Sequence, residues 1–172
     1  MVRIANKDDI DRIVEMEIFV NRYNLKNILP NDFLYDKNTF EKKRKWVEET
    51  FVEMGKNENL EIYVLEDDKI VKGYFSVEYD QNKMNECVLL QFLIDVPFQN
   101  DKYGTLLLSN CLDIVREKGK RVIRIEDVFE QNITAIKFYE KFGFEIVSKY
   151  LLEGWNLYVY KFIKNIEWRT PP

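Results

Sequence analysis

A polar turn near the middle of the chain has the character of an anion-binding site. The turn, residues 98–105, follows the apolar run 88–94. Behind it, apolar residues recur at helical spacing, namely Leu106, Leu107, Leu108, Cys111, Leu112 and Val115. A helix that begins in this turn leaves its first backbone N–H groups without partners inside the helix, and its dipole favours negative charge there. The sequence therefore predicts that a phosphate group binds at the turn.

A second motif lies about a helix and a strand later, and the two motifs together resemble the GNAT superfamily of N-acetyltransferases. The family's phosphate loop reads Gln/Arg-x-x-Gly-x-Gly/Ala, and residues 99–104 match it except that Lys102 replaces the first glycine. The family's later signature, Asn-x-x-Ala-x-x-Phe-Tyr-x-x-x-Gly-Phe, is matched without a gap at Asn132, Ala135, Phe138, Tyr139, Gly143 and Phe144. The alternative for the first motif is a polar turn that binds nothing.

The resemblance implies that acetyl-CoA binds at these motifs. In the family the fourth and fifth strands splay apart and the pantetheine arm enters between them. The residues that the resemblance assigns to the cofactor are Leu93, Ile94, Val96, Gln99, Asn100, Asp101, Lys102, Tyr103, Gly104, Thr105, Asn132 and Phe138. Two of these assignments stay open: Asn132 could cap its helix, contact the cofactor or do both, and Lys102 could either crowd the pyrophosphate or bind it.

Transfer of an acetyl group to an amine requires an acid for the leaving thiolate and a base for the ammonium proton. The resemblance makes Tyr139 the candidate acid, because the family's tyrosine often sits near the cofactor sulfur. The alternative is that Tyr139 belongs to the core face of its helix. Many relatives carry a glutamate on the strand before the loop. Here that strand is apolar, with Val88, Leu90 and Phe92 expected on one face and Leu89, Gln91 and Leu93 on the other, so Glu86 at its start is a tentative base. The alternatives are Asp95, Glu126, Asp127, a water relay and an amine that arrives already deprotonated.

Hydrophobic periodicity predicts a fold that agrees with the resemblance. Strands are expected at 2–4, 60–65, 70–79, 88–95, 121–125, 144–152 and 155–163, and helices from Asn6, over about 37–54, over 103–118 and from Asn132 to Phe142. Pro30 is expected to break the polar and aromatic stretch from Asn21 to Asp36. The passage from 88 to 125 reads as a parallel crossover. We therefore predict one α/β (α+β) domain, 1–172, with a mixed, mostly antiparallel sheet of about seven strands flanked by about four helices.

The amino-acid composition limits the kinds of ligand and partner that we expect for this protein. The 26 basic and 30 acidic residues give a net charge of −4 without a basic cluster, which argues against nucleic acid as the main ligand. The chain has no histidine, so His-dependent triads and the common His-containing zinc sites are excluded, and no metal is expected. No signal-peptide core and no membrane-spanning run is visible, and Cys87 and Cys111 form no C-x-x-C, so we expect a cytoplasmic protein without a membrane partner. A homodimer stays open.

The acceptor should be recognised by the region 19–55 and the last hairpin, which wall the acceptor pocket in this family. Aromatic and acidic side chains recur there, namely Tyr23, Phe33, Tyr35, Trp46, Trp155 and Tyr158 with Asp32, Asp36 and Glu153. Such walls suit an amine with apolar or cationic character. The predicted function is acetyl transfer from acetyl-CoA to a primary amine of a small molecule, polyamine-like or another metabolite, or of a protein. The alternative is a non-catalytic acyl-CoA-binding module.

Overall fold

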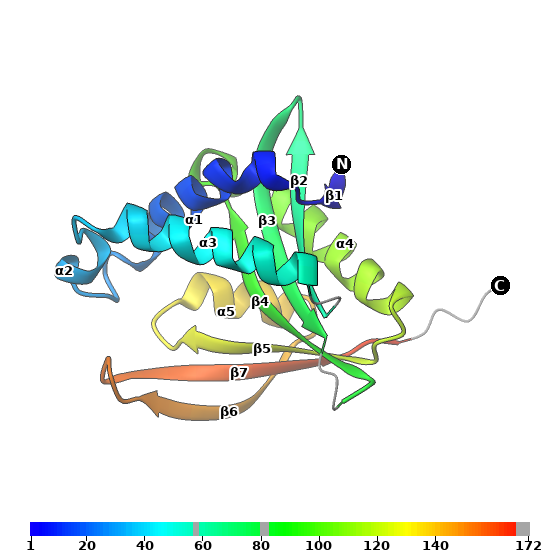
Figure 1. The fold of residues 1–172 in the computed structure, drawn as a ribbon. Coiled ribbons are helices and arrows are strands. Elements are labelled where there is room, and N and C mark those ends of the chain that lie inside the picture. Colours follow the sequence, from blue (N-terminus) through cyan, green and yellow to red (C-terminus); the bar gives the residue numbers. More distant parts are fainter. Residues whose placement is uncertain (57–58, 80–82, 168–172) are drawn as a thin grey trace.

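A seven-stranded sheet runs through the molecule in a computed structural model that describes residues 1–56, 59–79 and 83–167 (Figure 1). Its strands are β1 (Val2–Ile4), β2 (Leu60–Asp67), β3 (Ile70–Tyr79), β4 (Glu86–Ile94), β5 (Val122–Phe129), β6 (Glu145–Leu152) and β7 (Leu157–Asn165). They lie in the order β1-β2-β3-β4-β5-β7-β6, and only the β4–β5 pair is parallel. The predicted mixed, mostly antiparallel sheet is confirmed.

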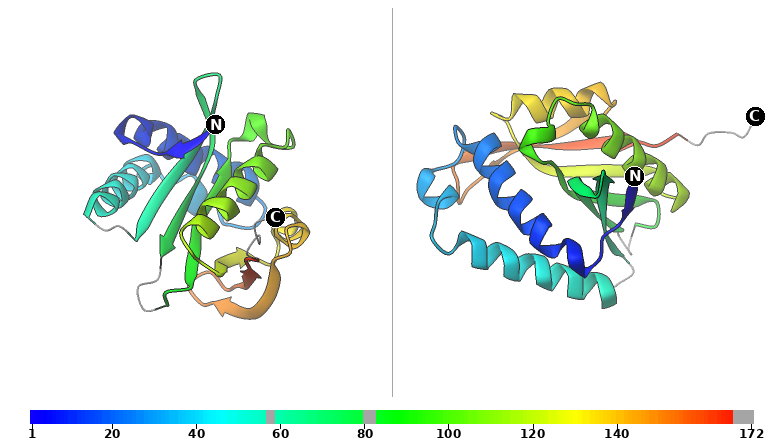
Figure 2. Two further views of the ribbon diagram at one scale, coloured as in Figure 1. Left: turned by 90° about the vertical axis from the view of Figure 1, so that its right-hand side faces the viewer. Right: turned by 90° about the horizontal axis from the view of Figure 1, so that it is seen from above.

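Helices cover both faces of the sheet. They are α1 (Ile10–Leu25), α2 (Asn31–Leu34), α3 (Thr39–Lys56), α4 (Tyr103–Glu117) and α5 (Ile133–Lys141). Helices α1 and α3 lie on one side, and α4 and α5 lie on the other, as seen end-on in Figure 2. Each side has its own buried apolar cluster, so the sheet is the shared wall of two cores.

The helix starts follow the polar residues that the sequence marks. The Asn6 side chain accepts from the backbone of Asp8, and Asp9 bonds back to the Asn6 backbone, in a capping box ahead of α1. The short helix α2 was not expected, since Pro30 was predicted to break the stretch from Asn21 to Asp36. A proline is tolerated at the start of a helix, where its missing N–H is not needed, and α2 begins directly after Pro30.

Strands β4 and β5 pair over four residues each and then part. The pairs run from Glu86 with Val122 to Leu89 with Ile125, and no further β4–β5 pair is present in the described part of the chain. Both strands carry a bulge where they separate. Leu90 has no partner on β3, and the β5–β7 register skips over residues 126–127. Because a bulge bends and twists its strand, two bulges at one level turn the strands away from each other.

The bulge at Leu90 also exchanges the faces of β4. Leu89 and Phe92 both contact the core under α4 and α5, whereas Leu93 contacts the core under α1 and α3. The prediction that Val88, Leu90 and Phe92 share one face, opposite Leu89 and Leu93, was therefore wrong, because the extra residue shifts the alternation by one.

Gly73 on β3 allows the end of β4 to lie close by. It pairs with Ile94, and a Cβ atom at Gly73 would lie 2.5 Å from Cδ1 of Ile94 and 2.6 Å from the backbone oxygen of Leu93. The side chain of Ile94 could turn aside, but the carbonyl belongs to the ladder. Gly73 therefore fixes the position from which the chain leaves the sheet.

We expect Gly73→Ala to destabilise the protein by about 1–3 kcal/mol, because the added methyl group forces the end of β4 to move. Urea unfolding followed by circular dichroism measures the change. Gly55→Ala is the matched control, since a Cβ at Gly55 in α3 meets no atom within 4 Å, and it should leave stability unchanged or slightly higher. Equal stability of the two variants would show that β4 adapts freely.

Candidate functional site

Hydrogen bonds to backbone carbonyl groups and to side chains hold the turn after β4 in shape. A short 3-10 helix, Val96–Phe98, follows Asp95, whose carboxylate accepts from the backbone N–H of Val96 and pairs with Arg12 of α1. The Gln99 side-chain amide donates to the backbone oxygen of Ile94 at 2.9 Å. These bonds tie the turn to the strand end and to α1.

The same turn presents a run of free backbone donors. The N–H of Gln99 donates to Val96 and that of Leu106 donates to Lys102, at 3.2 and 3.0 Å. Between them, over residues 100–105, no backbone N–H donates to another described group. These donors lie at the N-terminus of α4, where the helix dipole is positive, so the turn can bind a phosphate group. This is the arrangement that the sequence predicts.

Two residues of the turn have left-handed backbone. Asn100 has φ 70° and Lys102 has φ 67°. Asparagine adopts this conformation readily, but for lysine it costs about 1–2 kcal/mol relative to glycine. The left-handed turn gives a physical reason for glycine at this position in the family's loop. Lys102 therefore adopts the backbone that a glycine would, and its side chain is exposed at the helix start.

A buried lysine lies beside the turn. Lys72 of β3 pairs with Asp67 at 2.5 Å and donates to the hydroxyl of Tyr103 at 2.6 Å. Its ammonium lies 5.0 Å from the ring centre of Phe98 and 4.5 Å from that of Tyr103. The Asp67 carboxylate and the Tyr103 hydroxyl raise the pKa of Lys72 above its usual value, so the ammonium stays charged next to the donors. No local pattern in the sequence joins these four residues, and sequence reasoning missed the cluster.

The second motif packs directly against the turn. A Cβ atom at Gly104 would lie 3.5 Å from the ring of Phe138, and the side chain of Ile94 is also near. Helix α5 thus supports the first turn of α4. Asn132 accepts from the backbone N–H of Ala135 at 3.2 Å, so it caps α5. The capping alternative for Asn132 is therefore confirmed.

Tyr139 lies in the core beside the parted half of β4. Its side chain is 7% exposed, and its ring centre lies 6.3 Å from that of Phe92 on β4. The rings of Phe138, Phe144 and Phe162 surround it at 5.6–5.9 Å. Burial raises the pKa of the Tyr139 phenol, and its hydroxyl has no hydrogen bond to another described residue. The ring is core, as the alternative reading has it, while the hydroxyl keeps its proton and is available to another group.

The four candidate carboxylates lie in different places. Glu86 is at the paired end of β4, 3.3 Å from both Lys83 and Arg124, and eight residues, or about 25 Å of strand, separate it from Ile94. Asp95 is paired with Arg12. Glu126 and Asp127 form the bulge of β5. The structure thus separates Glu86 from the turn and brings two acidic residues to the level where the strands part.

Residues 126 and 127 are both exposed, and each has one partner. Glu126 pairs with Lys161 at 3.2 Å, and Asp127, with φ 58°, accepts from the hydroxyl of Tyr150. Both partners come from the last hairpin. The pair is therefore accessible and anchored to β6 and β7.

The predicted acceptor walls meet at one contact. The rings of Phe33 in α2 and Trp155 in the last hairpin lie edge to face, 4.4 Å apart. The remaining aromatic residues of the prediction, Tyr23, Tyr35, Trp46 and Tyr158, are exposed. The segment between α1 and α3 and the final hairpin therefore touch, although more than a hundred residues separate them.

Among the helices of the described residues, none is long and apolar enough to cross a bilayer.

Comparison with known proteins agrees with this geometry. A curated relative, the spermine/spermidine N(1)-acetyltransferase of Bacillus subtilis strain 168, is 37% identical over 71 residues, which cover 40% of this chain. The match spans only 45% of that relative's length.

Solved structures extend the likeness to nearly the whole fold. The PaiA N-acetyltransferase of Thermoplasma acidophilum, in complex with coenzyme A, superposes with a TM-score of 0.78 at 18% identity, over 94% of this chain and 96% of that one. A chimera of the spermidine N-acetyltransferase SpeG from Vibrio cholerae and hSSAT gives 0.72 at 17% identity, over 96% and 95%. At such identities the likeness shows the fold. The model of the acetyltransferase (GNAT) family matches residues 23–144, and the chain belongs to this family.

Proposed function

We propose that the protein transfers an acetyl group from acetyl-CoA to a primary amine of a small molecule, and that residues 1–172 act as one domain. The observation that carries the proposal is the parting of β4 and β5 next to a turn with free N–H donors. An extended ligand that ends in phosphates fits both features, because strand edges without partners bind an extended chain and the turn binds the phosphates.

Different residues would bind the pyrophosphate and the pantetheine arm of acetyl-CoA. The backbone N–H groups of 100–105 would hold the pyrophosphate, with the Lys72 ammonium adding positive potential behind them. The edge of β4 at Leu93 and Ile94 would pair with the pantetheine arm, because β5 no longer covers it. The Val96 N–H and the Ile94 carbonyl already have partners within the turn, so they would have to exchange them to take part. When bound, acetyl-CoA supplies an acetyl group activated as a thioester. Gly104 and Phe138 set the shape of the first turn of α4.

Proton transfers are assigned to groups near the parting of the strands. Tyr139 would donate its proton to the leaving thiolate, since burial keeps the phenol protonated and its ring lies against Phe92 of β4. We assign the ammonium proton to the carboxylates of Glu126 and Asp127, directly or through water. Glu86 is left out of this assignment because it lies at the paired end of the strand.

A diamine or polyamine is the acceptor class that we favour. Curated relatives that match part of the chain are named for spermine and spermidine, and the net charge of −4 suits a cationic substrate.

Incubation with acetyl-CoA and a panel of amines, with detection of free thiol, tests the function. Release of thiol with none of them would leave a non-catalytic acyl-CoA-binding module, which the lysine at the loop's glycine position favours.

Coenzyme A at 100 times its dissociation constant should raise the free energy of unfolding by about 2.7 kcal/mol. Gly104→Glu should weaken binding roughly 100-fold or more, because it places an anion beside the phosphates. Gly104→Ala is the matched control. Its methyl group makes ordinary contacts with Phe138, so affinity should stay near that of the wild type. Titration calorimetry measures all three proteins, and unchanged affinity of Gly104→Glu would place the phosphates elsewhere.

Removal of one hydroxyl group tests the acid. Tyr139→Phe keeps the ring in the core and should lower kcat by roughly 10²–10⁴-fold, with little change in the affinity for acetyl-CoA. Tyr63→Phe removes a hydroxyl group that bonds to Glu61 on β2, outside the site; it serves as the control and should retain full turnover. Normal turnover by Tyr139→Phe would make water the acid and leave Tyr139 a core residue.

The base assignment is tested by exchanging carboxylates for amides. The double variant Glu126→Gln/Asp127→Asn should lower kcat/KM at neutral pH by roughly 10²-fold or more. Asparagine tolerates the left-handed backbone at position 127, so the fold should survive. Glu86→Gln should have no effect on kcat/KM. The reverse pattern would return the role of base to Glu86.

A further inference from the structure

A carboxylate is buried between α1, α3 and β3 on the side of the sheet away from α4. Glu17 of α1 is 1% exposed, and three side chains bond to its carboxylate. One oxygen accepts from the hydroxyl of Tyr74 on β3. The other accepts from the ammonium of Lys43 on α3 at 2.8 Å and from the amide of Asn21 at 3.2 Å. A buried charge of this kind needs a counter-charge, which Lys43 supplies.

Lys43 differs from the other partners of Glu17 because it reaches the site from the surface. The side chain of Lys43 is 33% exposed, whereas Tyr74 lies in the core and is only 1% exposed. Its ammonium also lies 5.0 Å from the ring centre of Trp46. This ammonium thus meets a carboxylate and an indole face, which are groups that recognise an alkylammonium ion. The chain's own lysine shows that an ammonium on a butyl chain fits there.

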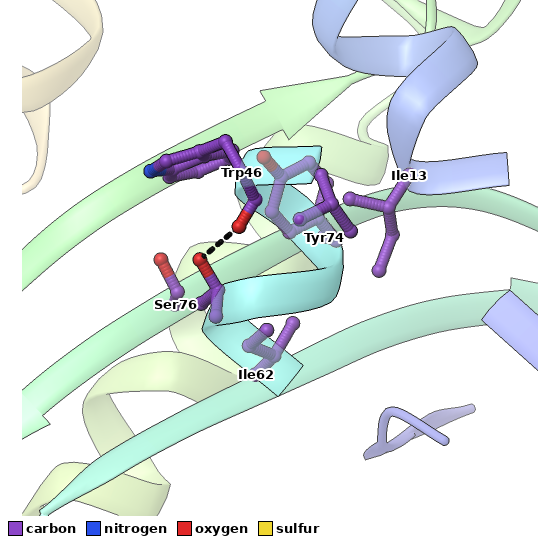
Figure 3. A pocket seen from close by; sticks show the side chains of 7 residues that line it. Ile13, Trp46, Ile62, Tyr74 and Ser76 are labelled. Atoms are coloured by element: carbon purple, nitrogen blue, oxygen red, sulfur yellow. Dashed lines mark hydrogen bonds between the residues drawn. The ribbon is translucent and has the colours of Figure 1, made fainter. Parts of the chain in front are cut away.

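A small cavity lies beside Trp46 and Tyr74, two residues of this region. Trp46 and Tyr74 line it together with Ile13, Thr50 and Ser76 (Figure 3). Ser76 is 4% exposed, and its hydroxyl has no hydrogen bond to another described residue. Ser76 pairs with Gln91, the residue directly after the Leu90 bulge. Tyr74 and Ser76 are two residues apart on β3, so both side chains lie on the same face of the strand.

We propose that Glu17 is a subsite for the second ammonium group of a diamine or polyamine, which binds there by displacing Lys43. The exchange replaces one ammonium group by another, so the Glu17 carboxylate always has a counter-charge. The free-energy penalty of desolvating that carboxylate is therefore the same before and after the exchange. Lys43 moves into solvent, where its charge is well hydrated. The reacting amine then lies toward Ser76 and Gln91, near the parted strands. Only this last step rests on the proposed acetyl transfer; binding at Glu17 does not.

Titration of the protein with 1,4-diaminobutane tests the subsite. Glu17→Gln should weaken diamine binding about tenfold or more, because a charge-assisted hydrogen bond is lost. Lys43→Ala should bind the diamine several-fold more tightly than the wild type, since no side chain has to be displaced. Lys45→Ala is the control on the same helix; its side chain is 77% exposed, and affinity should not change. Unchanged affinity in Glu17→Gln, or weaker binding by Lys43→Ala, would overturn the proposal.

Chemical rescue provides an arm that does not depend on Glu17→Gln folding. Lys43→Ala leaves a buried carboxylate unpaired and should unfold at a lower temperature than the wild type. Butylammonium chloride should restore its thermal stability, and sodium chloride at equal ionic strength should not. Rescue by both salts, or by neither, would show that Glu17 does not accept an alkylammonium ion.

Turnover separates this proposal from the proposed function. With acetyl-CoA, Glu17→Gln should lose kcat/KM for 1,4-diaminobutane and keep that for butylamine. If no amine is acetylated but the binding and rescue patterns hold, the subsite stands and the proposed function falls. If both amines are acetylated and Glu17→Gln treats them as the wild type does, the function stands and the subsite is wrong.

Discussion

Backbone groups inside a sheet need partners, and β4 and β5 stop supplying them to each other after four residue pairs. The bulges at Leu90 and at 126–127 produce this separation, and each is fixed by the register with the strand on its other side. The rest of the candidate site depends on it. The edges that it leaves are the place for an extended ligand, the turn after β4 lies at its open end, and Tyr139 and the β5 carboxylates lie along it.

Core packing and the site use the same residues. The ring of Phe138 supports Gly104 in the turn and also packs against Phe92 and Tyr139. Gly73 lets the end of β4 approach β3. A change that loosens this aromatic cluster would therefore move the donors of the turn as well as the core, so stability and ligand geometry are coupled through α5.

Local sequence patterns predicted the order of the elements, the donor turn and the α5 motif, because each depends on residues close together in the chain. They failed where one extra residue in a strand changed the face of the sheet on which the following residues lie. The bulge at Leu90 reverses the alternation on which the faces of β4 were predicted. Contacts between distant residues were also invisible. Lys72 meets Tyr103 across 31 positions and Glu17 meets Tyr74 across 57, and no periodicity marks either pair. The short helix α2 was missed because a proline was taken only as a breaker.

The contact between Phe33 and Trp155 joins segments that belong to neither the donor turn nor the α5 motif. The family match covers Phe33 but ends at residue 144, before the hairpin that carries Trp155. A substitution of either ring would therefore leave the residues of the donor turn and of the α5 motif themselves unchanged. Descendants of one ancestral gene could diverge at this contact, each toward a different acceptor, while inheriting the rest of the fold unaltered.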